Sequence, residues 1–244
     1  MSRDRLPDPT AVSPPLGLDA DDVHVWQVSL EAAPEVLQRF TETLSEDETA
    51  RAKRFHFERD RSSFIAARGA LRALLGRYLA TAPAQLSFKY GPQGKPELDP
   101  ETDLAFNLSH SATTALIGLA RGEPIGIDLE QVQAFDVVQD LPEAIFSPRE
   151  LAEFSALPAT ELPMAFFAAW TRKEAVVKAL GLGFSMPVRE VEVTFASGAP
   201  VTLVRLEGDS TLAACWTLMD LPAPPGFRAA LARPGSVRRV LWQA

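Results

Sequence analysis

The chain has 244 residues, of which 46% are hydrophobic and 23% are charged, a composition typical of a globular protein with one large domain or two of about 120 residues. Its formal net charge of −8 argues against general nucleic-acid binding, and no apolar run reaches the roughly 18 residues of a membrane span. The first residues contain no apolar signal segment and Cys215 is the single cysteine, so we expect a cytoplasmic protein without an intramolecular disulfide.

The N-terminal part of the chain predicts a tail, a strand and two helices. Residues 1–21 are rich in proline and predict a flexible tail. Alternating valines predict a strand over residues 22–30, with His24 exposed on the opposite face. Ser45 opens a short helix that ends near Arg54, and an apolar stripe predicts a longer helix over residues 60–79.

These two helices carry a local excess of positive charge. The basic residues between positions 51 and 77 are Arg51, Lys53, Arg54, Arg59, Arg61, Arg68, Arg72 and Arg77, against only Glu58 and Asp60. A solvated helix face explains such a run about as well as a binding site does. On an acidic protein, however, a local positive surface also suggests a specific anionic ligand or an acidic partner.

The middle of the chain predicts a loop and a hairpin. Glycine and proline punctuate residues 91–96, which predicts a loop. Two apolar runs at residues 104–111 and 113–119 predict strands that pair with each other. His110 stands at the end of the first strand beside two serines. A lone histidine is usually structural, but this position can present a side chain to a ligand.

The most informative stretch is the predicted strand over residues 124–130. Residues two apart on a strand share a face, so Asp128 and Glu130 point the same way while Leu129 turns into the core. In the predicted helix over residues 166–180, Glu174 and Lys178 lie one turn apart on one face. Three carboxylates beside lysine fit Mg²⁺ holding a phosphorylated ligand. A solvated strand end and a surface ion pair are the alternatives, but the apolar surroundings favour a site.

The remaining segments predict structure more than chemistry. Ser147-Pro-Arg-Glu150 has the pattern of a helix capping box, which by itself explains Glu150. Short strands are expected at residues 188–195, 201–206, 212–218 and 227–231, with Cys215 as a small core residue in the third. The strand–helix–strands order thus occurs twice, so we expect an α+β protein with one lobe over residues 22–122 and a second over residues 123–244.

The motifs together resemble those of the 4′-phosphopantetheinyl transferases of the longer, two-lobed Sfp type. The resemblance spans roughly residues 45–185 and rests on Phe106-Asn-Leu-Ser-His-Ser111, Pro124-Ile-Gly-Ile-Asp-Leu-Glu130, Phe146-Ser-x-x-Glu150 and Trp170-Thr-x-Lys-Glu-Ala-x-x-Lys178. Gly94-Lys-Pro96 and the segment Arg51-x-x-Arg54-Phe match that type as well. The resemblance implies a pseudo-dimeric fold of two similar α+β lobes in one chain, with coenzyme A in the cleft between them. It also implies transfer of phosphopantetheine to a serine of an apo carrier protein, in the manner of a holo-acyl-carrier-protein synthase, with release of adenosine 3′,5′-bisphosphate.

The resemblance also implies a role for individual residues. Mg²⁺ would be held by Asp128, Glu130 and Glu174, and phosphate oxygens would be neutralised by Lys173, Lys178 and His110, with Ser109 beside them. Arg51 and Arg54 would hold the ribose 3′-phosphate, and Lys95 and Pro96 would line the adenine end. The base is either Glu174 or Glu150 acting through water. Glu48 departs from the family pattern, because a basic residue can stand there near the 3′-phosphate, and Phe184 stands where leucine is more frequent. With both lobes in one chain, a monomer is expected.

Two other functions compete with this interpretation. A catalytically inactive carrier-binding scaffold of the same fold is opposed by the intact carboxylates and lysines. A Mg²⁺-dependent nuclease usually has an acid-x-Lys pattern on one strand, whereas Glu130 is followed by Gln131 and Val132. The net charge also disfavours DNA. The sequence does not indicate which carrier, fatty-acid, polyketide or nonribosomal-peptide, is modified.

Overall fold

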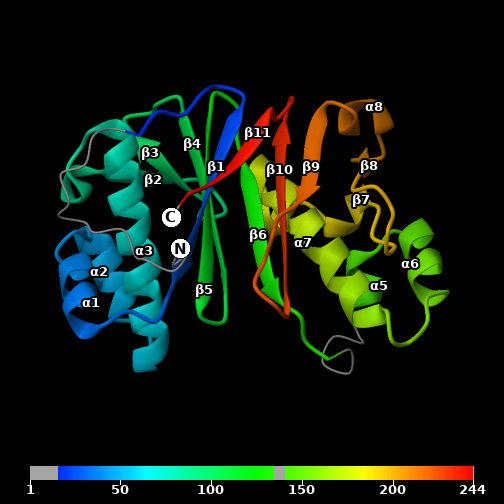
Figure 1. Ribbon diagram of the computed structural model, residues 1–244, viewed down its shortest axis with the longest axis horizontal. Helices are drawn as coiled ribbons and strands as arrows, with labels where there is room; N and C mark the ends of the chain where they lie inside the picture. The colour runs from blue at the N-terminus through cyan, green and yellow to red at the C-terminus, as the bar shows by residue number, and fades with distance from the viewer. Residues whose placement is uncertain (1–15, 135–140, 244) are drawn as a thin grey trace.

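The computed structural model describes residues 16–134 and 141–243, which form two lobes side by side (Figure 1). The first lobe contains β1 (Asp22–Ser29), α1 (Pro34–Thr41), α2 (Glu46–Ala52), α3 (Glu58–Leu79), β2 (Ser87–Tyr90), β3 (Pro96–Asp99), β4 (Leu104–Ser111) and β5 (Thr114–Arg121). The second contains β6 (Gly126–Gln131), α5 (Pro142–Ile145), α6 (Pro148–Ser155), α7 (Leu162–Leu180), β7 (Val191–Val193), β8 (Leu203–Leu206), α8 (Ser210–Ala213), β9 (Trp216–Asp220) and β10 (Phe227–Pro234). The last strand, β11 (Arg239–Gln243), returns to the first lobe.

Each lobe packs one long helix against one sheet. The first sheet has the order β11-β1-β5-β4 and the second the order β6-β10-β9. In Figure 1 the two sheets face each other at the centre, and α3 and α7 lie on the outer sides. A layer of buried side chains fills the space between the sheets, including Val25, Leu116, Ile127 and Leu231. The α+β class and the two-lobed organisation are therefore confirmed.

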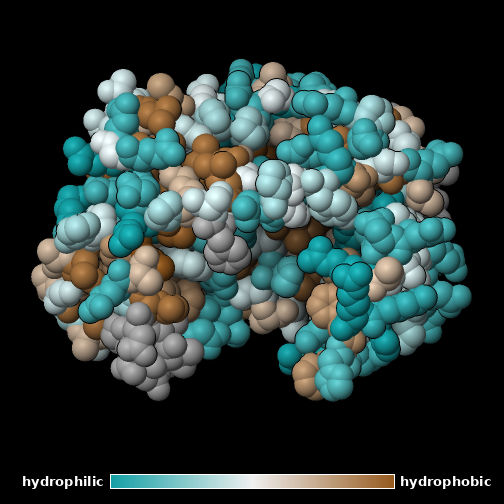
Figure 2. Space-filling view, turned by 180° about the vertical axis from the view of Figure 1, so that it is seen from behind, coloured by the Kyte–Doolittle hydropathy of each residue, from teal (hydrophilic) through white to brown (hydrophobic). Residues whose placement is uncertain are grey.

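Strands β4 and β6 bring the two lobes into direct contact. Side chains of β4 donate to or accept from groups of β6 at three successive alternate positions, from Asn107 with Ile127 to Ser111 with Gln131. The constant offset of 20 residues means that the two strands run in the same direction. In Figure 1 the β4–β5 turn and the end of β6 both lie at the lower edge, and the outline of the molecule is indented there between the lobes (Figure 2).

The C-terminal strand crosses the expected boundary between the lobes. Strand β11 pairs in parallel with β1, from Asp22 opposite Arg239 to Trp26 opposite Gln243. The expected boundary after residue 122 therefore does not assign every residue to its lobe. The last strand follows the second lobe in the sequence but completes the sheet of the first lobe.

Two local predictions were wrong, and the end of the expected tail is described by the structure. His24 is buried, because β1 lies between two strands and under α3, and its Nδ1 lies 2.6 Å from the hydroxyl of Tyr78. Cys215 is exposed, because residues 212–218 form the end of α8 and the start of β9. Leu18 is buried, so the part of the expected tail that the structure describes packs on the first lobe; residues 1–15 lie outside the described residues. No helix in the described parts of the chain is long and apolar enough to cross a membrane.

Candidate active site between the two lobes

Three carboxylates of the second lobe lie on two elements that approach each other unusually closely. Asp128 and Glu130 follow Gly126 on the face of β6 that packs against α7, and Glu174 lies on α7. A Cβ atom at Gly126 would stand 1.8 Å from the carbonyl oxygen of Ala175. Only glycine therefore allows this helix to sit so close to the strand, and the close approach brings the three carboxylates into one electrostatic group.

Asp128 is fully buried and only partly satisfied. Its Oδ1 accepts hydrogen bonds from Lys178 Nζ at 2.5 Å and from Ser109 Oγ at 2.8 Å. Its Oδ2 is buried without a hydrogen-bond partner among the described residues. An unsatisfied buried carboxylate oxygen is costly in the absence of a cation or a donor.

Glu130 and Glu174 both carry raised pKa values. Desolvation raises the pKa of Glu174 most, and the neighbouring charges of Asp128 and Glu130 raise it further, against the opposing effect of Lys178. Desolvation and the charge of Asp128 likewise raise the pKa of Glu130. Three carboxylates thus share one nearby ammonium group, and a divalent cation would relieve the repulsion between them.

The donor set fits Mg²⁺, although the side chains are not arranged as around a bound ion. Among the residues that the structure describes, no three acidic, histidine or cysteine side chains already form a metal-binding group. The structure instead places Lys178 on Asp128 Oδ1. The unpartnered Oδ2 and the two half-buried glutamates still offer the hard oxygen ligands that Mg²⁺ prefers, with room for water or phosphate. The residues present therefore fit the ion.

A chain of basic groups leads from these carboxylates into the first lobe. His110 is exposed at the surface. Partial desolvation of its ring and the charge of Lys178 nevertheless lower its pKa. It lines a cavity of about 200 Å³ together with Arg51, Arg68 and Pro96. Arg51 also lines a wider hollow of about 800 Å³ with Arg54 and Tyr90. The two hollows share Arg51 and Gly94, and we call them together the basic recess, which is lined by Arg51, Arg54, Pro96 and His110.

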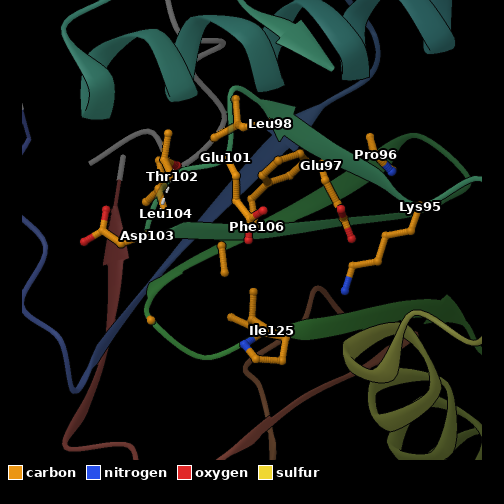
Figure 3. A pocket seen from close by; sticks show the side chains of 13 residues that line it. Lys95, Pro96, Glu97, Leu98, Glu101, Thr102, Asp103, Leu104, Phe106 and Ile125 are labelled. Atoms are coloured by element: carbon orange, nitrogen blue, oxygen red, sulfur yellow. Dashed lines mark hydrogen bonds between the residues drawn. The ribbon is translucent and has the colours of Figure 1, made fainter. Parts of the chain in front are cut away.

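The ammonium group of Lys95 binds the end of α7 in the second lobe, whereas the family resemblance implied that Lys95 lines the adenine end of coenzyme A. Its Nζ donates to the carbonyl oxygens of Lys178 at 2.6 Å and Ala179 at 3.2 Å, so Lys95 caps the C-terminal end of α7 from the other lobe. Together with Pro96 it borders an adjoining pocket of about 230 Å³, which shares Pro96 and Phe106 with the cavity beside His110 and has an apolar floor that includes Phe106 and Ile125 (Figure 3). The rim of that pocket carries Glu97, Glu101 and Asp103, and this acidic rim makes it unsuited to a phosphate group.

Lys173 and Glu150 are not brought to the cleft. Both side chains are fully buried, and Lys173 Nζ donates to Glu150 Oε2 at 2.7 Å and to the carbonyl oxygen of Val191. Glu150 also accepts from the backbone N–H of Ser147 at 2.9 Å and of Val193 at 2.8 Å. The structure therefore gives no support for a phosphate role of Lys173 or a base role of Glu150, because every polar contact of this pair lies inside the second lobe.

Glu48 is also structural. It accepts from Ser45 N at 3.0 Å in the capping box of α2, and from the guanidinium groups of Arg68 and Arg72. Burial works to raise the pKa of Glu48, but these two arginines outweigh burial and keep the pKa below its usual range. Glu48 therefore fixes Arg68 and Arg72, and its carboxylate offsets part of the positive charge that Arg68 brings to the recess.

Two residues that the sequence did not single out belong to this region. Ser111 Oγ donates to Glu130 Oε2 at 3.1 Å, and the alternation of Asn107, Ser109 and Ser111 along β4 is the pattern that could have identified it. Tyr90 receives a hydrogen bond from Arg68 Nη2 at 2.9 Å and forms one wall of the recess. No sequence signal pointed to Tyr90, since its partner is 22 residues away on α3.

Comparisons with known proteins agree with this organisation. Residues 26–120 match the family model described as 4′-phosphopantetheinyl transferase, N-terminal, and residues 124–232 match the 4′-phosphopantetheinyl transferase superfamily. The 4′-phosphopantetheinyl transferase HetI of Nostoc sp. (strain PCC 7120) is 38% identical over 94% of this chain and 93% of its own length. A putative 4′-phosphopantetheinyl transferase of Synechocystis sp. (strain PCC 6803) is 40% identical over 61% of each chain. A solved ACPS–CoA complex covers 47% of this chain and 98% of its own at 20% identity and a TM-score of 0.35, too distant to support an argument.

Proposed function

The chain belongs to the 4′-phosphopantetheinyl transferase superfamily, and as such it is an enzyme that transfers 4′-phosphopantetheine to a carrier protein. From this premise we propose that the donor is coenzyme A, that the reaction depends on Mg²⁺, and that it takes place where the two lobes meet. The observation that carries the proposal is the group formed by Asp128, Glu130 and Glu174, with an unpartnered buried oxygen, next to a basic recess of the other lobe.

Asp128, Glu130 and Glu174 would hold the metal, which when bound polarises the diphosphate and offsets its charge. Lys178 and His110 lie between the carboxylates and the recess, and they neutralise phosphate oxygens as negative charge develops on the leaving group. For this role Lys178 would move its ammonium group from Asp128 Oδ1 toward the phosphates, which would leave the Asp128 carboxylate available to the metal. Ser109 retains its hydrogen bond to Asp128.

The acceptor reaction needs a base for the serine proton. The carrier's Ser Oγ forms a bond to the β-phosphorus, the bond from that phosphorus to the bridging oxygen breaks, and adenosine 3′,5′-bisphosphate leaves. We assign the serine proton to Glu174, the half-buried carboxylate that lies one helical turn from Lys178 on α7. Glu150 is left out of the mechanism, since it is fully engaged by Lys173, Ser147 and Val193.

The basic recess suits the other end of the donor. Arg51 and Arg54 line its wider part, where they would hold the ribose 3′-phosphate, and Pro96 lines the narrower part nearer His110. Asp47 also lines the wider part, where its Oδ1 accepts a hydrogen bond from Ser45 Oγ at 2.6 Å, and the two arginines would offset its charge. Lys95 lies outside the recess and acts by fixing α7, which carries Glu174 and Lys178.

The acceptor is proposed to be an apo carrier protein whose acidic helix meets the positive side of this recess. Because the chain supplies both lobes of the site, we propose that it works as a monomer. We also propose that it works in the cytoplasm. The single cysteine, which leaves no intramolecular disulfide to maintain, is consistent with that compartment.

Mass spectrometry of an apo carrier protein tests the proposed function. The carrier should gain one phosphopantetheine when it is incubated with the enzyme, coenzyme A and Mg²⁺, and adenosine 3′,5′-bisphosphate should appear in equal amount. Chelation of the metal should stop both. Binding of the apo carrier without any mass gain would favour an inactive scaffold, and metal-dependent cleavage of DNA would favour a nuclease. One apo carrier each from fatty-acid, polyketide and nonribosomal-peptide synthesis would identify the acceptor class.

A further inference from the structure

Strand β4 contacts β6 through side chains at three alternate positions. Residues two apart on a strand share a face, and here that face is polar where a core strand is usually apolar. The backbone N–H groups of Ile127, Leu129 and Gln131 donate to Asn107 Oδ1 at 2.9 Å, Ser109 Oγ at 3.2 Å and Ser111 Oγ at 3.0 Å. The three side chains therefore satisfy backbone donors of β6 in the way that a neighbouring strand would.

The two serines make a second contact that Asn107 does not make. Ser109 Oγ donates to Asp128 Oδ1 at 2.8 Å, and Ser111 Oγ donates to Glu130 Oε2 at 3.1 Å. A hydroxyl group has one proton and two acceptor positions. Because each hydroxyl accepts from a backbone N–H, its own proton is directed at the carboxylate. The same two-bond arrangement is thus repeated at Ser109 and Ser111.

We propose that Ser111 is a positioning residue for metal binding, and this inference rests on the proposed role of Glu130 as a metal ligand. Ser111 comes from the first lobe, whereas the three proposed metal ligands all come from the second. Ser111 holds Glu130 Oε2 from the first lobe, and Trp170 on α7 adds a further hydrogen bond to the same half-buried carboxylate, so Ser111 contributes the restraint that comes from the other lobe. The first lobe thereby sets the geometry of a metal site to which it gives no ligand.

Ser111 is a better test of this idea than Ser109. Ser109 Oγ also receives a hydrogen bond from Lys178 Nζ at 3.0 Å, so its loss would disturb the ammonium group as well as a carboxylate. Among the described residues, the Ser111 hydroxyl bonds to the carboxylate of Glu130 and the N–H of Gln131. Asn107 offers a matched control, because it accepts from the N–H of Ile127 in the same row and, among the described residues, makes no hydrogen bond to a carboxylate.

Binding of Mn²⁺ to the full chain, measured by electron paramagnetic resonance without coenzyme A or carrier, provides the test. Removal of a side chain that orients a metal ligand typically weakens metal affinity about 10–100-fold. We expect Ser111→Ala to weaken Mn²⁺ binding by that factor and Ser111→Thr, which keeps the hydroxyl on a strand-compatible side chain, to restore it. Asn107→Ala should leave the affinity unchanged. In the transfer reaction, Ser111→Ala should need more metal for half-maximal rate but recover its kcat at saturation.

The variants separate the proposed metal site at Glu130 from the proposed positioning role of Ser111. Weakened binding in Glu130→Gln together with unchanged binding in Ser111→Ala would overturn the positioning role and leave the proposed metal site standing. Unchanged binding in Glu130→Gln, or no binding to the unsubstituted chain, would overturn the proposed metal site itself. Equal weakening by Ser111→Ala and Asn107→Ala would show that the contact between the strands matters and not the bond to Glu130, and this also overturns the inference.

Discussion

At the scale of single residues, burial separates two lysines that lie five positions apart on α7. Lys178 is half-buried and reaches Asp128 and Ser109 at the joint between the lobes. Lys173 points into the second lobe, where burial lowers its pKa and Glu150 partly compensates. The sequence shows both as flanks of Glu174, but only Lys178 lies on the same helix face as that glutamate.

Loss of the Lys173 ammonium group should affect stability far more than coenzyme binding. Lys173→Met leaves the Glu150 carboxylate buried without its cation, which typically costs about 3–5 kcal/mol in the free energy of unfolding. Urea unfolding measures this cost, and Lys173→Met combined with Glu150→Gln should recover part of it. Near-normal stability of Lys173→Met with a raised KM for coenzyme A would restore the phosphate role.

The basic recess makes a prediction about coenzyme selectivity. Arg51→Ala and Arg54→Ala each remove a group that lines the recess. A charge-assisted hydrogen bond contributes about 1.5–3 kcal/mol, so kcat/KM should fall tenfold or more for coenzyme A but little for 3′-dephospho-coenzyme A. Lys53→Ala, an exposed neighbour outside the residues that line the recess, is the control. Equal losses with both donors would assign the arginines to the carrier protein.

At the scale of elements, the packing of α7 on β6 positions the proposed metal ligands. Period-two alternation placed Asp128 and Glu130 on one face, and spacing by one helical turn placed Glu174 beside Lys178, so these relations could be predicted from the sequence. The contact between the two elements could not, because it depends on Gly126 meeting the backbone at Ala175. A glycine in a strand indicates a close approach but not the partner.

Gly126→Ala should therefore damage both the fold and the site. Its Cβ would lie 1.8 Å from Ala175 O and 2.5 Å from Ala179 N, both backbone atoms, so the helix must move. Overpacking of this kind costs about 1–3 kcal/mol or more. We expect a lower Tm and weaker Mn²⁺ binding, whereas Gly17→Ala, with open space around its Cβ, should change neither. Unchanged metal affinity in a destabilised Gly126→Ala protein would separate the helix position from the site.

At the scale of the whole molecule, the chain joins its lobes a second time through its C-terminal end. Arg238 Nε donates to Asp22 Oδ1 at 2.9 Å, and Arg239 Nη2 donates to Asp22 Oδ2 at 2.5 Å. These residues are more than 200 positions apart, so no local pattern could predict that β11 completes the first sheet. Local periodicity identified β4, β6 and α7, whereas the pairing of β11 and the burial of His24 arise from long-range packing.

This connection makes stability depend on pH in a defined direction. Hydrogen bonds from Arg238 and Arg239 hold the pKa of Asp22 below its usual range. In the unfolded chain the carboxyl group of Asp22 has a pKa of about 3.9. The stabilisation of the folded state by these bonds is therefore fully present above that pH and is lost as the pH falls toward the lower pKa of the folded state. Arg238→Ala combined with Arg239→Ala should therefore lower the free energy of unfolding at pH 7, and the difference in this free energy from the unsubstituted chain should narrow below about pH 4.

Urea unfolding of both proteins across this pH range measures the difference, with the exposed Arg189→Ala as control. A difference that does not vary with pH would contradict the role of Asp22.

Anomalous diffraction from crystals grown with Mn²⁺ and coenzyme A tests the central claim most directly. We predict one manganese peak at about 2.0–2.6 Å from oxygens of Asp128, Glu130 and Glu174 and of the diphosphate, a range typical of hard cations. The 3′-phosphate should lie against Arg51 and Arg54. A manganese peak away from these carboxylates, or coenzyme A in the acidic pocket beside Lys95, would contradict the account.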